Sequence, residues 1–386
     1  MECTTSGGWG QEYEEGSLGA TYLSLKDQRA KRGIRYALAP LLMVMTLAKR
    51  CGEDQPKALA EWVSLRSDML KALLKLPWKR MPHASTYRRV MQQGVDVTQL
   101  EQEAGTYLST MNPAASEQLS LDGKTLRGTI PTGETQGVHV LAVQEVTKNL
   151  VLAQIEVGVK ENEISAAPRL MGQVDVEGKV ISGDAMQTQR ALSAQIVEKG
   201  GDYLWIVKEN QPTLRMDIET LFMNQGMPCH LTDFRTAQTI DKGHGRMEQR
   251  RLTARSALND YLDWPYVGQV LKIERETYDG RKQHTHSEIV YGITSLPAAK
   301  ADSARFMALV RNHWRIENGL HYRRDVTFQE DACRMQSRMA AQVLAVLNNL
   351  AIGLIRYLGW NNAAEARRFF AARIGEALSH ILCCPS

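Results

Sequence analysis

Hydrophobic positions recur every three or four residues in two early segments of the chain, 37–49 and 56–76. This spacing places apolar side chains on one face of an α-helix. A further helix is expected to begin at HASTYRRVMQQ, with Ser85 as its cap. We therefore predict a small all-helical domain over residues 23–108. Residues 1–22 show no hydrophobic period and are expected to form a flexible lead-in.

The pattern changes after residue 109, where short apolar and β-branched runs alternate with turn residues. The runs LSLDG, HVLAVQEV, LVLAQIEV, KVISGD and YLWIVK are expected strands, and residues 163–172 and 187–199 are expected helices between the later ones. Three strands followed by alternating helices and strands predict a mixed α/β sheet over residues 109–214.

A second strand-rich stretch covers residues 215–298. The runs LTDFRTAQTI, RMEQRRLTARS, YVGQVLKIERETY and HSEIVYGITSL predict β-hairpins there, which we expect to be inserted into the sheet domain. Residues 299–386 are expected to complete the core and to end in helices. Within them, residues 340–357 are strongly apolar, which predicts a buried helix.

Length and composition narrow the class of protein. A chain of 386 residues exceeds a typical single core, so we expect two domains or one domain with a large insertion. Hydrophobic residues make up 43% and charged residues 23%, as in globular proteins. We see no apolar stretch of membrane-spanning length and no secretion signal, and we expect a cytoplasmic protein without a membrane partner. The six cysteines lack paired spacing, which argues against a disulfide framework or a zinc site.

Basic residues gather in four segments, although the net charge of the chain is only +4. The segments are 26–35, 79–89, 242–255 and 311–324. Each alone is consistent with a solvated face, but the four together favour a phosphate-rich partner. Two interpretations of the helical domain stay open: DNA binding by one of its helices, or a bundle that only packs on the core.

Two aspartates follow apolar runs that we expect to be strands. Asp122 follows residues 119–121, and Asp184 follows residues 180–182 and a glycine. Functional groups commonly lie where strands emerge from the core of a sheet. Convergent carboxylates can hold magnesium, and two divalent ions about 4 Å apart can activate a nucleophile and stabilise the leaving oxygen of a phosphodiester. With a third acid nearby, these residues would form a metal-dependent nuclease centre.

The third candidate acid is Glu317, on a predicted helix. His313, Glu317, His321 and Arg324 are spaced by four, four and three residues, so a continuous helix would place them on one face. Metal ligation beside phosphate contacts suits such a face. An intrahelical ion pair between Glu317 and His321 or Arg324 explains it equally well.

Several longer segments match a known family. They are LDGKTLRG, VHVLAVQEV, SGDAMQTQ, GGDYLWIVKENQPTL, KGHGRMEQR, HWRIENGLHYRRDVTFQED and the N-terminal block from LKDQRAKRGIRYALAPLL to HASTYRRVM. In these segments the chain resembles the DDE transposases of bacterial insertion sequences, specifically the H-repeat-associated family. The resemblance covers residues 23–358.

The resemblance implies an RNase H-like mixed sheet with a β-rich insertion, in which Asp122, Asp184 and Glu317 bind two magnesium ions. Manganese is expected to substitute for magnesium. It also implies cleavage at the ends of the protein's own element, followed by attack of the freed 3′ hydroxyl on target DNA. The implied partner is double-stranded DNA at the nucleoid, bound by a homodimer on paired element ends.

Ten residues are candidates for DNA contacts. They are Lys124, Arg127, Lys208, Asn210, Gln211, His244, Arg246, His313, His321 and Arg324. Related transposases place a tyrosine seven residues before the glutamate, an arginine four before it and a lysine seven after it. Here these positions hold Val310, His313 and Arg324, so only the last keeps a basic residue of that motif. A DNA hairpin intermediate is therefore not implied.

Two other functions stay open at this point. A domesticated, non-enzymatic DNA-binding protein would keep the fold without mobility. A metal-dependent nuclease without strand transfer would keep the same acids and release cut ends unjoined. Short inverted repeats and target duplications beside the gene would favour a mobile element.

Overall fold

The structure is a computed structural model that describes residues 4–6, 12–32, 34–111, 116–223, 233–243, 246–256, 261–279, 284–314 and 316–384, without the side chains of residues 4–6, 12, 317 and 318. The chain divides into two compact units. The first comprises Met1–Ala115, Gly123–Val159 and Glu317–Ser386, and the second comprises Ser116–Asp122 and Lys160–Ile316.

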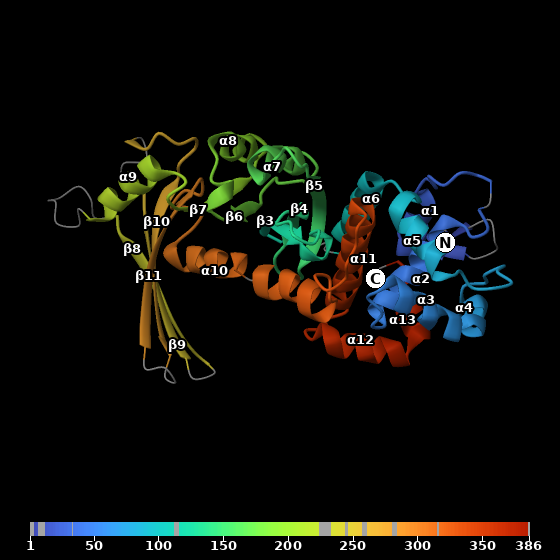
Figure 1. The fold of residues 1–386 in the computed structure, drawn as a ribbon. Helices are drawn as coiled ribbons and strands as arrows, with labels where there is room; N and C mark the ends of the chain where they lie inside the picture. Colours follow the sequence, from blue (N-terminus) through green and yellow to red (C-terminus); the bar gives the residue numbers. More distant parts are fainter. Residues whose placement is uncertain are drawn as a thin grey trace. The chain divides into compact units, whose positions relative to one another are not determined.

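The first unit is built mainly of helices around α11 (Arg338–Tyr357), which contacts the second, fifth and sixth helices (Figure 1). The other helices of this unit are α1 (Leu18–Ser24), α2 (Leu38–Arg50), α3 (Pro56–Leu65), α4 (Ser67–Leu73), α5 (Ala84–Gln93), α6 (Val97–Thr110), α12 (Ala363–Ala372) and α13 (Ile374–Leu382). The helical domain predicted from the hydrophobic period thus shares one unit with the C-terminal helices.

Helix α11 is long and apolar enough to cross a membrane by length and composition, contrary to the expectation from sequence. However, 89% of its most apolar window is buried inside the protein. An apolar helix covered on all sides is typical of a protein core. The buried helix predicted over residues 340–357 is therefore confirmed.

Two details of the N-terminal region differ from the predictions. Tyr13 and Leu18 are buried and α1 begins at Leu18, so ordered structure starts before residue 22. The paired strands β1 (Thr4–Ser6) and β2 (Glu12–Glu14) are too short to produce a hydrophobic period. The cap of α5 is His83 instead of Ser85, because the His83 Nδ1 accepts a hydrogen bond from the backbone N–H of Ser85.

The first unit also holds the strands β4 (Val138–Glu145) and β5 (Leu150–Val157), which pair antiparallel. Strand β3 (Gln118–Leu126) begins in the second unit and ends in the first, where it neighbours β4. Side chains of β3 and β4 pack on α11 in a cluster that includes Leu126, Val140 and Ala345.

In the second unit, β3 pairs in parallel with β6 (Val180–Gly183), and β6 pairs in parallel with β7 (Asp202–Val207). Helices α7 (Glu163–Met171) and α8 (Arg190–Glu198) lie between these strands in the chain, as predicted. The strand order β5-β4-β3-β6-β7, with the last three parallel, is that of an RNase H-like sheet. The predicted fold class is confirmed.

The sheet continues beyond β7 through four antiparallel strands in the order β11-β10-β9-β8. They are β8 (Arg235–Gly243), β9 (Arg246–Arg255), β10 (Gln269–Asp279) and β11 (His284–Thr294). The predicted hairpins are present, after a helix, α9 (Pro212–Met223), that was not predicted. Because β11 pairs directly with β7, the inserted strands extend the core sheet.

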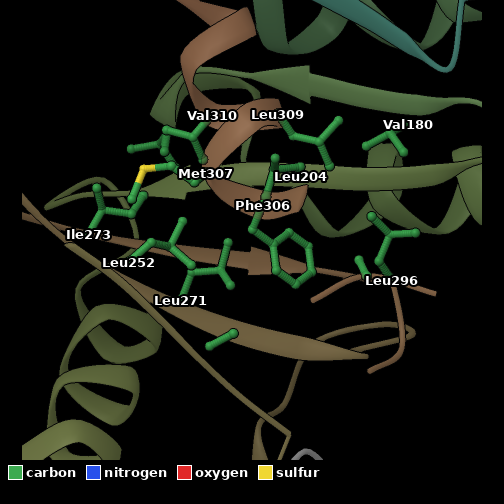
Figure 2. Close-up of a cluster of buried hydrophobic side chains, with 13 residues drawn as sticks. Val180, Leu204, Leu252, Leu271, Ile273, Leu296, Phe306, Met307, Leu309 and Val310 are labelled. Atoms are coloured by element: carbon green, nitrogen blue, oxygen red, sulfur yellow. The ribbon is translucent and has the colours of Figure 1, made fainter. Parts of the chain in front are cut away.

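Helix α10 (Ser303–His313) supplies the core of this extension. Figure 2 shows Phe306, Met307 and Val310 of α10 against Leu252 of β9 and Leu271 of β10, all of them buried. Each buried side chain of this size contributes roughly 1.5–3 kcal/mol. Packing on the strands therefore fixes α10, and with it the direction in which the chain leaves the helix.

The helix that was predicted to carry His313, Glu317, His321 and Arg324 on one face is interrupted. Helix α10 ends at His313 with Trp314 as its C-cap, and the chain continues in two π-helical segments, Glu317–His321 and Arg323–Thr327. In a π-helix the hydrogen bonds join residues five apart, so residues four apart no longer lie directly above one another. The predicted common face is therefore wrong.

Candidate active site

Asp122 and Asp184 occupy equivalent positions on neighbouring parallel strands. The register of β3 and β6 pairs Leu121 with Gly183, and each aspartate is the next residue along the chain. Asp184 directly follows the end of β6, as predicted. Asp122 lies inside β3, which runs on to Leu126, so its predicted place at a strand end is wrong, although its pairing with β6 does end at Leu121.

The loop after β6 is held by hydrogen bonds on both sides of Asp184. Its Oδ1 accepts a hydrogen bond from the backbone N–H of Met186 at 2.9 Å. The Asn210 side-chain amide donates to the Ala185 carbonyl at 2.6 Å, and the Gln211 amide donates to the Thr188 carbonyl at 2.9 Å. Asn210 and Gln211 were candidates for DNA contacts, but their amide groups position this loop.

Negative charge gathers at Asp184. Burial among protein atoms raises the pKa of its carboxyl group, and the carboxylate of Glu163 raises it further. The hydrogen bond from Met186 and the charge of Lys208 act in the opposite direction. Glu163 lies in the first turn of α7 and accepts a hydrogen bond from Gln187 at 2.7 Å. Sequence reasoning missed Glu163, because no spacing relates it to Asp184.

These residues suit a divalent cation. Two hard oxygen donors start at the same level of adjacent strands, and a third carboxylate acts on one of them. Among the described side chains, no group of three or more histidine, cysteine, aspartate or glutamate residues has the arrangement of a complete metal site. The side chain of Glu317, the third predicted ligand, lies outside the described residues.

A buried polar network joins the C-terminal end of α10 to the strands that carry the aspartates. His313 Nδ1 lies 3.3 Å from Ser182 Oγ, which also contacts the Gln118 amide at 3.0 Å and Ser120 Oγ at 3.1 Å. The Gln118 amide also donates to the carbonyl of Leu309 at 2.9 Å. Burial lowers the pKa of His313 to about 4. His313 is therefore uncharged at neutral pH and ties the helix to the sheet.

Arg324 is buried in an ion pair with Glu330. Its Nε lies 2.9 and 3.0 Å from the two Glu330 oxygens, and Glu330 also accepts from the Asn348 amide at 2.7 Å. Both charged groups are almost fully enclosed. Arg324 therefore cannot reach a phosphate in this structure, and Glu330 cannot serve as a metal ligand.

Lys124 and His321 are also unsuited to bind phosphate as they stand. The Lys124 ammonium is buried 2.5 Å from Asp325 and 3.9 Å from Asp331. Burial, together with the charges of Arg324 and Lys124, lowers the pKa of His321 to about 3. His321 is thus uncharged at neutral pH.

Three of the predicted DNA contacts are exposed cations. They are Arg127, which lies 3.9 Å from Asp331, Lys208, and Arg246, which lies 3.4 Å from Asp279. His244 lies outside the described residues. Arg127, Lys208 and Arg246 thus remain accessible to a phosphate backbone.

The chain matches the family model "Transposase DDE domain" over residues 114–354 and the model "DDE_Tnp_1-associated" over residues 21–108. The chain belongs to the DDE transposase family, whose members generally use divalent metal ions.

Three similar proteins come from Escherichia coli. "H repeat-associated putative transposase YhhI" of strain K12 is 31% identical over 244 residues, and so is "Putative protein YbfL". Each match covers 61% of this chain and 63% of the relative. The chain thus spans less than two thirds of the length of these relatives. "Putative transposase YncI" of strain O157:H7 is 26% identical over 340 residues, covering 87% of this chain and 86% of the relative.

Among solved structures, the chain is similar to the cryo-EM structure of a piggyBac transposase synaptic complex with hairpin DNA. The sequence identity is 12% and the TM-score is 0.46, and the match covers 95% of this chain and 77% of that chain.

Proposed function

We propose that this chain is a transposase that cuts DNA at the ends of its own element and joins the freed ends to target DNA. Asp122, Asp184 and Glu317 would hold two magnesium ions, with manganese as a substitute. The observation that carries this proposal is the strand register that pairs Leu121 with Gly183, the residues directly before Asp122 and Asp184. Two carboxylates at one level of a sheet, with a third near Asp184, favour binding of a divalent cation.

Chain connectivity supports Glu317 as the third ligand. His313 contacts Ser182, two residues before Asp184, and Glu317 follows His313 by four residues. Four residues span at most about 14 Å, so the Cα atom of Glu317 lies within about this distance of the Cα atom of His313. Glu330 is neutralised by Arg324, which leaves Glu317 the stronger candidate of the two.

The bound ions would lower the pKa of the attacking hydroxyl group and stabilise charge on the phosphate. The chain's own residues orient the carboxylates. The Met186 N–H fixes one oxygen of Asp184, while Asn210 and Gln211 hold the loop around it. Lys208 is exposed and acts electrostatically on Asp184, so it is placed to attract a phosphate to the same site.

A second surface of the first unit is suited to the DNA backbone. Residues 26–35 contain five lysines and arginines and one acid, and residues 71–93 contain six lysines and arginines and no acid. The net charge of these two segments is therefore 5 − 1 + 6 = +10, against +4 for the whole chain. The acid, Asp27, is already paired with Arg29 at 2.6 Å.

The fold brings these two segments together along α5. The backbone N–H of Gln28 donates to the Gly94 carbonyl just beyond the C-terminal end of the helix. Near the other end, the Tyr36 hydroxyl donates to the Arg80 carbonyl and the Tyr36 ring packs against Trp78, with ring centroids 5.0 Å apart. The first segment therefore passes along the length of α5.

We define the basic surface as the exposed cations of these segments. They are Lys26, Lys31, Arg32, Arg35, Lys75, Lys79, Arg80, Arg88 and Arg89. None of them forms an ion pair with a described residue. Unpaired cations on a helix and its neighbouring loops are what a duplex requires for phosphate contacts. We therefore assign DNA binding to this part of the helical domain.

The function can be tested with DNA that carries the sequences flanking the gene, mixed with a plasmid target and magnesium. We expect cuts at defined positions in the flanks and covalent joining of the cut ends to the plasmid. DNA with scrambled flanks is the control and should stay uncut. Binding without cutting would identify a DNA-binding protein, and cutting without joining would identify a nuclease; either result would contradict the proposal.

A further inference from the structure

The four strands β8 to β11 present two faces of different chemistry. In the strand registers, Thr239, Arg250, Arg275 and Glu288 form one row across the sheet. The adjacent row consists of Ile240, Gln249, Glu276 and Ser287. Because side chains alternate along a strand, adjacent rows point to opposite faces.

The side chains of the first face have their partners within the protein. Near β7 it carries the core that packs on α10. Further along the strands it carries a network of ion pairs: Arg250 with Asp241 and Glu248 at 2.6 and 2.7 Å, and Arg275 with Glu288 at 2.5 Å. Arg311 of α10 adds a contact to Asp241 at 3.1 Å, and Arg246 lies 3.4 Å from Asp279. The charges on this face are largely compensated.

Among the described residues, cover on the opposite face lies only near β7. There, Tyr291 is buried and its ring lies 6.3 Å from that of Phe222 of α9. Beyond this helix the strands continue for several residues, as Figure 1 shows for β8 to β11. The residues of β8 that point to this face, Thr236, Gln238, Ile240 and Lys242, are all exposed.

Four large hydrophobic side chains lie on this uncovered part. They are Ile240, Met247, Tyr278 and Ile289, with exposed fractions of 57%, 39%, 40% and 50%. They come from all four strands, and Met247 and Tyr278 are direct cross-strand partners. We call this set the apolar face. Apolar residues gathered on one face, opposite a face of paired charges, mark an interaction surface.

We propose that the apolar face is the surface through which two copies of this chain associate. Charge complementarity supports a second copy as the occupant. The same face carries two cations, Lys242 and Arg251, and an anion, Glu276, that pair with no described residue. In an isologous contact, the apolar side chains of both copies meet and the cations of one copy can pair with Glu276 of the other.

DNA is a poorer match for this face. Among its described residues, Lys242, Arg251 and Lys272 are opposed by Glu274 and Glu276, and Lys272 is already 2.8 Å from Glu274. A phosphate backbone would leave the exposed isoleucines without apolar contact. In contrast to this mixture of cations and anions, the basic surface beside α5 consists of exposed cations. The inference gives a location to the homodimer of the proposed function, and it does not depend on DNA cleavage.

The test measures self-association of the full chain by sedimentation equilibrium, without DNA or metal. We expect the parent to form dimers, and Ile240→Lys and Ile289→Lys each to raise the dimer dissociation constant by about tenfold or more. Met216→Lys on α9 is the control, since Met216 is also exposed but lies outside the apolar face, and it should leave dimerisation unchanged. Circular dichroism melting of each variant verifies that it is folded.

Charge reversal provides a second measurement. Arg251→Glu and Glu276→Arg should each weaken the dimer, and the double variant should recover part of the loss because the pairing is restored with opposite signs. A parent that stays monomeric would overturn the inference, as would dimers indifferent to Ile240→Lys and Ile289→Lys. Variants that keep the dimer but lose DNA affinity would show that the face binds DNA, which also overturns it. A parent that forms the dimer but does not cut DNA would count against the proposed function alone.

Discussion

Burial changes the role of several residues that the sequence marks as DNA contacts. Val310, His313 and Arg324 occupy the positions at which related transposases carry tyrosine, arginine and lysine, and all three are buried. Val310 belongs to the α10 core, His313 contacts Ser182, and Arg324 pairs with Glu330. His313 and Arg324, which were expected to contact DNA, thus form hydrogen bonds and an ion pair inside the protein, and Val310 packs in the core.

The pair of Arg324 and Glu330 should contribute to stability in a way that depends on both partners. Among the described side chains, Arg324→Met leaves the Asn348 amide as the remaining hydrogen-bond donor to the buried Glu330 carboxylate, which should cost about 3–5 kcal/mol of unfolding free energy. The double variant Arg324→Met/Glu330→Gln should recover most of this loss, because no buried charge remains. Urea unfolding at pH 7 measures both.

The matched control for this pair is Arg338→Met, which removes a partly exposed ion pair with Glu156. Such pairs contribute about 0–1 kcal/mol. A loss from Arg324→Met no larger than that from Arg338→Met would show that the buried pair is not a structural clamp.

Glu101 should make the stability of the first unit depend on pH. Burial raises its pKa from 4.5 to about 8, while a hydrogen bond from Gln154 opposes this. Between these two pH values the folded state keeps a proton that the unfolded state releases, so stability falls as pH rises. Glu101→Gln keeps the acceptor for Gln154 and should stabilise the protein by up to about 5 kcal/mol at pH 8.5, with little effect at pH 4.5.

Urea unfolding at the two pH values checks this prediction. Glu61→Gln on α3 is the control, because Glu61 is exposed and should behave like the parent at both. An equal effect of Glu101→Gln at pH 4.5 and pH 8.5 would contradict the assignment of a raised pKa.

At the scale of elements, helix α5 combines a buried face with the basic surface. Tyr87, Val90 and Met91 are buried, whereas Arg88 and Arg89 are exposed. The hydrophobic face anchors the helix, so its charged face can be changed with little effect on folding.

Substitution of Arg88→Gln and Arg89→Gln together should weaken binding to duplex DNA by about tenfold or more at low salt. It should also reduce the slope of log affinity against log salt by up to about 2, one for each lost phosphate contact. Fluorescence anisotropy with EDTA present measures binding without cleavage.

The control for this variant is Arg368→Gln/Arg373→Gln, which removes two exposed arginines of the same unit. It should change affinity far less. Equal losses in the two double variants would mean that the basic surface has no special role in binding.

The pattern of hydrophobic positions predicts elements well where they are long and periodic. Helices α2, α3 and α11 and the inserted strands agree with it, because each buries one face or all of its surface. The interruption after His313 could not be predicted, because the sequence keeps a helical spacing while the backbone changes to π-helical hydrogen bonds.

The sequence predicted the two aspartates of the site but not their surroundings. Asp122 and Asp184 follow apolar runs in the sequence. In the structure they directly follow Leu121 and Gly183, which are paired in the strand register. Glu163 carries no such signal, since it approaches Asp184 only through the fold. The pairing of Lys124 with Asp325 joins residues 201 positions apart in the chain, which periodicity cannot reveal.

At the scale of the whole molecule, the chain does not fold in the linear order of domains that its sequence suggests. Residues 23–108 were expected to form a domain of their own, but their helices share a unit with α11 to α13. The predicted catalytic acids are contributed by separate stretches, with Asp122 and Asp184 in the second unit and Glu317 at the start of the last segment of the first.

The central claim, that Glu317 completes a metal site with Asp122 and Asp184, is tested most directly by one rate. The measurement is the rate at which Glu317→Gln cuts DNA carrying the gene's flanking sequences in magnesium, relative to the parent. Asp175→Asn is the control, since Asp175 is an exposed carboxylate just before β6. We predict at least about a hundredfold loss for Glu317→Gln, with DNA binding and the control rate unchanged. Cleavage by Glu317→Gln at the parent's rate would contradict the account.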